Sequence, residues 1–159
     1  MTKAEIVAAA RAQIQRDLGR MRGWAEETRR AATHEEARPE NDKDTRGLEQ
    51  SYLARGQAMR AEELAEADER LRFLTLRSYR PDDPIGLAAL VKVEVDEEPR
   101  TYFLAPVGGG IEVELDGERV QLVTPASPLG RALVDKHVDD EFELRLAGRV
   151  REVIVTDLE

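Results

Sequence analysis

Acidic side chains gather in one short segment, where they could carry out carboxylate chemistry. Between residues 35 and 49 they are Glu35, Glu36, Glu40, Asp42, Asp44 and Glu49. Carboxylate oxygens are ligands that Mg²⁺ prefers, and a neighbouring carboxylate can orient or deprotonate an attacking water. Asp42 and Asp44 are therefore candidate metal ligands, and with Glu49 they are the candidate catalytic residues. The same types are also ordinary helix N-cap and first-turn residues, so a purely structural role stays open.

The elements on either side of this segment are predicted to be long helices. Over residues 3–36 good helix formers dominate, and apolar side chains recur at alternating steps of four and three. These seam positions are Ile14, Leu18, Met21, Ala25, Thr28 and Ala32, and Ala4 and Val7 keep the same phase. Pro39 ends the helix, because proline lacks an amide proton and restricts the residue before it. A second helix begins close to Asp44 and runs to about Leu74.

So short a connection requires the two helices to pack antiparallel. Each helix of about 30 residues is roughly 45 Å long. Residues 1–77 are thus predicted to form a coiled-coil hairpin with its tip near residues 37–47, which carries the acidic segment. A dimeric coiled coil is the competing interpretation. The proline and capping residues between the two predicted helices favour the hairpin.

Residues 78–159 have the pattern of a separate β-rich domain. Strands are expected at 90–95, 101–104, 111–115, 119–123, 142–146 and 150–155, with a hairpin turn at Asp116-Gly117. Ser127-Pro128 predicts the start of one short helix that ends near Val134. The fold class is therefore α+β, with a helical hairpin followed by a small antiparallel β-domain.

Composition and charge narrow the functional classes. The 159 residues carry a formal net charge of −9 and contain no cysteine, which excludes disulfides and thiol chemistry. No basic face is evident for direct nucleic-acid binding, so a protein partner is favoured. Neither a signal peptide nor a membrane-spanning run is recognisable, and a cytoplasmic location is expected. His34 and His137 have no neighbours at metal-ligand spacing.

The segment Ser127-Pro128-Leu129-Gly130-Arg131-Ala132-Leu133, followed by Asp139-Asp140-Glu141-Phe142-Glu143-Leu144, resembles the C-terminal domain of the GreA/GreB transcript cleavage factors. Residues 86–93 and 101–103 are similar to that family's first strands. The resemblance implies an FKBP-like β-domain that docks on RNA polymerase through the region of Ser127, Pro128 and Leu129. It also implies a hairpin that enters the secondary channel of the polymerase.

The same resemblance implies how such a protein works. It would be a monomer without enzymatic activity of its own, stimulating the polymerase's intrinsic nuclease with Mg²⁺ that the polymerase supplies. Contact with nascent RNA would be indirect, through the polymerase. The tip motif of the family is Asp-Leu-x-Glu-Asn-Ala-Glu-Tyr. If Tyr52 corresponds to the tyrosine of this motif, Thr45 corresponds to its Asp and Leu48 to its first Glu. Cleavage, channel binding without cleavage, and an unrelated FKBP-like isomerase or chaperone remain as alternatives.

Overall fold

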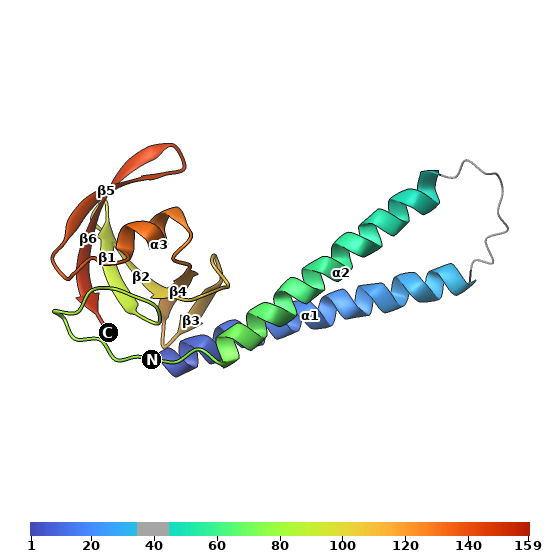
Figure 1. Ribbon diagram of the computed structural model, residues 1–159, viewed down its shortest axis with the longest axis horizontal. Coiled ribbons are helices and arrows are strands. Elements are labelled where there is room, and N and C mark those ends of the chain that lie inside the picture. The colour runs from blue at the N-terminus through green and yellow to red at the C-terminus, as the bar shows by residue number, and fades with distance from the viewer. Residues whose placement is uncertain (35–44) are drawn as a thin grey trace. The chain divides into compact units, whose positions relative to one another are not determined.

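The computed structural model describes the backbone of residues 1–34 and 45–159, and their side chains except for residues 31–34, 45–48, 50 and 146 (Figure 1). Its elements confirm the predicted α+β class, with two long helices first and a six-stranded sheet with one short helix after them. They divide into two compact units, residues 12–69 and residues 1–11 with 70–159. The boundary predicted between residues 77 and 78 stays a prediction. No helix in the described ranges is long and apolar enough to cross a membrane.

The helical unit consists of most of α1 (Lys3–His34) and α2 (Thr45–Arg72). Gln15 of α1 lies 3.3 Å from the carboxylate of Asp68 near the end of α2, so the two helices run antiparallel as predicted. Ile14 and Leu18 are buried at this end of the seam. Farther along, Met21 is half-buried and Ala25 and Thr28 are exposed, so burial of these seam positions ends at Leu18. Small side chains cannot fill the space between two helices that separate (Figure 1).

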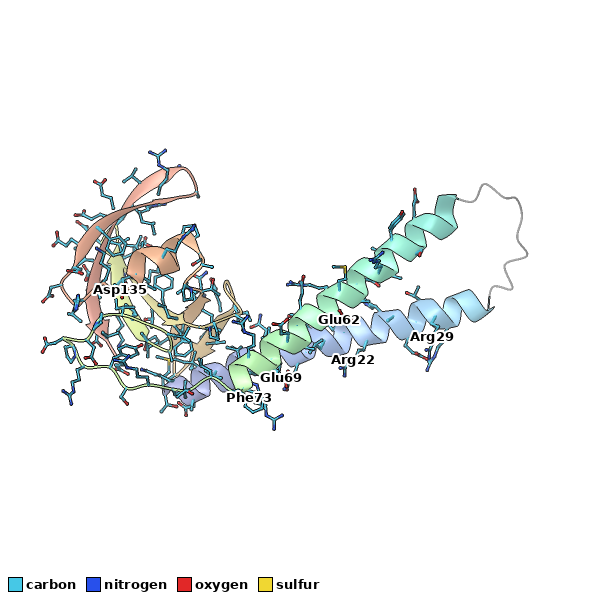
Figure 2. All side chains as sticks on the ribbon, viewed as in Figure 1. Arg22, Arg29, Glu62, Glu69, Phe73 and Asp135 are labelled. Atoms are coloured by element: carbon cyan, nitrogen blue, oxygen red, sulfur yellow. The ribbon has the colours of Figure 1, made fainter. Side chains whose placement is uncertain are left out.

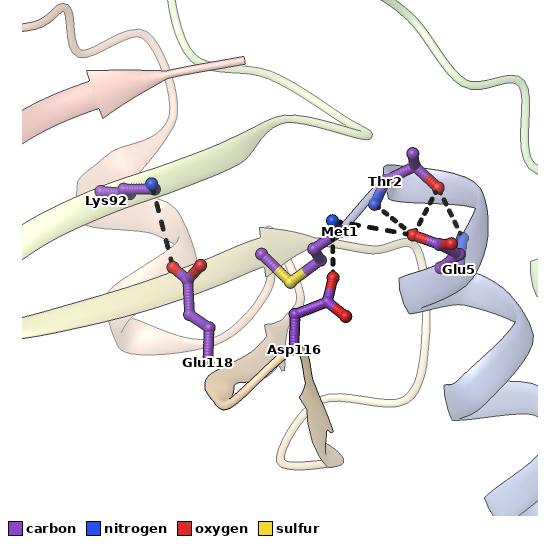
Figure 3. A network of polar contacts seen from close by, with 6 residues as sticks. All are labelled: Met1, Thr2, Glu5, Lys92, Asp116 and Glu118. Atoms are coloured by element: carbon purple, nitrogen blue, oxygen red, sulfur yellow. Dashed lines mark hydrogen bonds and ion pairs between the residues drawn. The ribbon is translucent and has the colours of Figure 1, made fainter.

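The start of α1 belongs to the same unit as the sheet. Thr2 and Glu5 form a capping box, in which Thr2 Oγ1 accepts from the Glu5 amide at 3.2 Å and Glu5 Oε2 accepts from the Thr2 amide at 2.6 Å (Figure 3). The Met1 ammonium group lies 2.8 Å from the carboxylate of Asp116, in the predicted Asp116-Gly117 turn. Ile6, Val7 and Ala10 are buried, whereas Ala4, a predicted seam position, is exposed.

The sheet has the order β3-β4-β2-β1-β6-β5. Its strands are β1 (Leu90–Val95), β2 (Glu98–Leu104), β3 (Glu112–Leu115), β4 (Glu118–Val123), β5 (Glu141–Leu146) and β6 (Arg149–Leu158). Every neighbouring pair is antiparallel except β2 and β4, which are parallel with Thr101 opposite Val120. The prediction of a wholly antiparallel domain was wrong at this pair. The chain reverses twice between β2 and β4, once before β3 and once after it, and two reversals restore the original direction.

Both faces of the sheet are apolar at its centre. Along β2, Phe103 is fully buried, and its neighbours Tyr102 and Leu104, which point to the opposite face, are buried as well. The short helix α3 (Pro128–Leu133) contributes Leu129 and Leu133 to the core on the face of Tyr102 and Leu104.

Candidate functional site

The hairpin end was predicted to carry the reactive carboxylates. Asp42 and Asp44 lie outside the described residues, so their roles as metal ligands and catalytic acids stay predictions. Glu49 lies in the second turn of α2 with an exposed side chain, and the first turn of that helix contains no acidic residue. Among the described residues no three carboxylate or imidazole groups come close enough to hold a metal ion.

Large apolar side chains are exposed along the described parts of the hairpin. Trp24 is 62% exposed on α1, and Tyr52 and Leu53 are 67% and 64% exposed on α2. Trp24 lies one position before the predicted seam residue Ala25, and its side chain points into solvent rather than packing at the edge of the seam. These exposed aromatic and aliphatic side chains are available for contact with another molecule. The arm thus presents apolar contacts as well as charge.

An apolar groove of about 320 Å³ runs between the two helices of the hairpin. Alanines at 54, 58 and 61 line it from α2, and Met21 and Ala25 line it from α1. Arg22 and Arg29 stand beside it on α1, where Figure 2 shows their side chains extending from the helix. Small residues at this spacing leave room for another side chain or helix to approach the backbone.

The turn before α3 is the second candidate region, and it is fixed by hydrogen bonds of one serine. Ser127 Oγ accepts from the Gly130 amide at 3.0 Å and donates to the Thr124 carbonyl at 2.8 Å. Ser127 is thus the N-cap of α3, and Pro128 takes the first helical position, as the sequence predicted. Pro128 is exposed, whereas Leu129 is only 8% exposed and packs in the core. Ser127 and Pro128 are therefore the members of the predicted contact set that lie nearest the surface.

Gly130 is required by the closeness of two backbone segments. A Cβ atom at this position would lie 1.9 Å from the carbonyl oxygen of Thr124 and 2.7 Å from its carbonyl carbon. Real Cβ atoms essentially never approach another atom within 3.0 Å. The glycine within the Ser-Pro-Leu-Gly segment thus allows α3 to pack directly on the turn at Thr124, which holds Ser127 and Pro128 in place.

A groove of about 400 Å³, which was not predicted from the sequence, lies beside this turn. Gly109, Gly110, Gln121 and Thr124 line it together with Ser127 and Pro128. Gly108 and Gly110 have φ angles of +78° and +90°, which glycine adopts without strain. Gly108 and Gly109 also pack closely on neighbouring side chains, since a Cβ would lie 3.1 Å from Ile111 at the first and 3.2 Å from the Thr124 methyl group at the second. Gly110 has open space beside it.

Tyr102 is the aromatic residue that lines this groove and two others on the β-domain. Burial raises the pKa of its hydroxyl, and the neighbouring Arg100 acts in the opposite direction. The phenol therefore stays neutral at physiological pH and can act as a hydrogen-bonding group. With one aromatic side chain, these grooves lack the concave aromatic lining that a prolyl isomerase would need.

The molecule thus belongs to the class of proteins that join an antiparallel helical hairpin to a small α+β domain. No protein-family model matches the chain, and no curated protein is a close relative. Among solved structures, the chain is similar to GreA factor homolog 1 (Gfh1) of Thermus thermophilus, with 22% identity, a TM-score of 0.40 and 95% of each chain covered. The chain is also similar to Gfh1 of Thermus aquaticus, with 21% identity and a TM-score of 0.41, and the match covers 96% of this chain and 95% of that protein.

A GreA/GreB elongation factor from Nitrosomonas europaea is also similar, with 18% identity and a TM-score of 0.38 over 60% of this chain and 78% of its own. Likeness at these values does not define an activity for the chain.

Proposed function

We propose that this chain is a Gre-like transcription elongation factor that binds RNA polymerase, inserts its hairpin into the secondary channel and stimulates cleavage of backtracked RNA. The observation that supports the proposal is that one chain contains both a helical arm and the hydrogen-bonded turn at Ser127 and Pro128, within a segment that resembles the GreA/GreB family. The chain would have no catalytic activity of its own. The polymerase would supply the Mg²⁺, and the acids at the hairpin end would complete its coordination or orient water.

The described part of the hairpin also supports a second function, binding in the channel without cleavage. The first turn of α2 contains no acidic residue, and Thr45 and Leu48 stand where the family motif has its Asp and first Glu. A factor of this kind would occupy the channel and modulate transcription. The exposed Trp24, Tyr52 and Leu53 would serve both functions, because they offer contact area without taking part in the reaction.

Cleavage of a backtracked elongation complex distinguishes the two functions. The wild-type chain is compared with the variant Asp42→Ala/Asp44→Ala/Glu49→Ala for binding to core polymerase and for shortening of labelled RNA. The matched control replaces the exposed acids Glu62, Glu66 and Glu69 of α2 by alanine, which changes the net charge equally. If the chain stimulates cleavage, the wild-type chain should shorten the RNA, and the first variant should do so at least about a hundredfold more slowly, as expected when a general acid–base group is removed. The control variant should shorten the RNA at the wild-type rate.

Each remaining outcome has a definite meaning. Binding of the wild-type chain without RNA shortening, together with competition against a cleaving factor, supports the second function. Failure of the wild-type chain to bind core polymerase would refute both. A Pro128→Glu variant tests the docking turn itself, because an acidic residue at the first position is compatible with helix α3. Its affinity for the polymerase should fall about tenfold with its melting temperature unchanged.

A further inference from the structure

Strand β5 is the last strand of the sheet, and no other strand among the described residues pairs with its outer edge. On its other edge, the Asp140 carbonyl oxygen, at the approach to β5, accepts from the Val155 amide at 3.0 Å. In an antiparallel ladder, alternate residues direct both backbone groups to the same neighbour. Phe142 and Leu144, two and four residues beyond Asp140, therefore direct their backbone groups toward β6. Glu141, Glu143 and Arg145 direct their amide and carbonyl groups outward. These three residues offer the hydrogen bonds that an added strand would use.

The side chains of β5 follow the same alternation. Glu141, Glu143 and Arg145 are exposed on one face of the sheet. Phe142 and Leu144 are partly buried on the opposite face and pack against the core. An added strand must therefore present apolar side chains on one face and charges on the other, because a shift of one residue would exchange the two faces.

A second copy of β5 meets these requirements when it runs antiparallel about a twofold axis at Leu144. Glu143 of each copy then lies opposite Arg145 of the other, and Leu144 lies opposite Leu144. The alternative register about Glu143 would place two glutamates opposite each other, and like charges in that position are destabilising. The strand is thus self-complementary in one register, which is the requirement for a twofold interface.

Two charges of this strand, Glu143 and Arg145, have no residue of opposite charge directly across from them on β6. Glu143 lies opposite another acid, Glu152, on β6, and Arg145 lies opposite Val150. Within the described part of the chain, neither Glu143 nor Arg145 takes part in a salt bridge. A second copy would give each of them an opposite charge. It would also relieve the repulsion between Glu143 and Glu152.

We propose that two copies of this chain associate through β5 and form one continuous sheet across the twofold axis. The interface is small, because one strand edge contributes few hydrogen bonds, so dilute protein remains the monomer that the sequence predicts. Association increases with concentration. The net charge of −9 on each copy opposes it at low ionic strength, where charges are poorly screened. This inference does not depend on polymerase binding.

Sedimentation velocity over a concentration series up to the millimolar range, in about 0.15 M salt, tests the proposal. The wild-type chain should shift from monomer to dimer along the series. Glu143→Lys places like charges at both symmetric positions and should weaken the dimer at least tenfold. Glu141→Lys is the matched control, since it makes the same charge change on the same strand and face but lies outside the Glu143–Arg145 pairs. It should leave the dimer unweakened.

The charge exchange Glu143→Arg/Arg145→Glu separates pairing from folding, because it restores opposite charges in the same register. It should dimerise as the wild-type chain does, while each single change does not. Thermal melting of every variant in dilute solution shows that the domain remains folded. A wild-type chain that stays monomeric throughout the series would overturn the proposal. Equal effects of Glu143→Lys and Glu141→Lys, or failure of the exchange to restore the dimer, would overturn it too.

Discussion

Replacing Gly130 by alanine should destabilise the β-domain, although alanine is the better helix former. The added Cβ would lie 1.9 Å from the Thr124 carbonyl oxygen, so one of the two segments must move by more than 1 Å to reach the 3.0 Å that real structures show. The obstacle is backbone, and no rotation of a side chain can relieve it. Movement of Thr124 would also disturb the two hydrogen bonds of Ser127, which join this turn to α3.

The expected magnitude follows from three contributions. Overpacking of a well-ordered site costs about 1–3 kcal/mol, and disturbance of a serine N-cap costs about 1 kcal/mol. Alanine recovers about 1 kcal/mol of helix propensity relative to glycine. The free energy of unfolding of Gly130→Ala should therefore fall by about 1–3 kcal/mol. Urea unfolding followed by circular dichroism at the β-sheet signal measures this value.

Gly109→Ala is the matched control, because its Cβ would meet the same residue, Thr124, but at 3.2 Å from a side-chain methyl group. A methyl group can turn or shift by a few tenths of an ångström, so the loss should stay below about 1 kcal/mol. Gly130→Ala with unchanged or increased stability would refute the reasoning that the close approach at Thr124 requires glycine. Equal losses in the two variants would refute it as well.

Three further changes test other parts of the β-domain. Ser127→Ala removes the N-cap of α3 and should cost about 1 kcal/mol in urea unfolding, whereas Ser127→Thr should keep most of the stability. Phe103→Ala empties a fully buried site and should cost about 3–5 kcal/mol, which the same measurement would register as a much lower midpoint. Hydrogen bonds from Arg151 and the Glu152 amide lower the pKa of Asp96, so its stabilisation is complete above the ordinary aspartate pKa of about 3.9 and is lost as the pH falls through the lower folded value. Thermal melts of Asp96→Asn and wild type should therefore differ most above pH 4 and converge in strong acid.

The sequence predicted elements well where the pattern is local. Pro39 and the acidic and capping residues after it indicated the break between the helices, and α1 and α2 end and begin on either side of that segment. Ser127 and Pro128 indicated the start of α3, because N-cap and first-turn preferences depend on neighbouring residues alone. The Asp116-Gly117 turn was predicted for the same reason, and both residues have the positive φ angles that such a turn needs.

Features that depend on distant neighbours could not be predicted in this way. Periodicity identifies a strand without identifying its partner, so the parallel pairing of β2 with β4 was missed. The same limit explains the start of α1, where the heptad phase favoured Ala4 but the structure buries Ile6 and Ala10. These residues belong to the unit that contains the sheet, and a seam derived for one helical partner does not apply there. The need for glycine at 130 likewise arises only when α3 packs on Thr124.

The position of Glu49 within α2 bears on how a carboxylate could reach a partner's metal. Glu49 is four residues beyond Thr45, where the helix begins, so its backbone lies about 6 Å behind that end. Its exposed side chain is free to extend, but the helix does not present it as the foremost group. Asp42 and Asp44 precede Thr45 in the chain. Under the cleavage proposal these two aspartates would carry the metal contact and Glu49 would act on water, so loss of RNA shortening should follow the aspartates more closely than the glutamate.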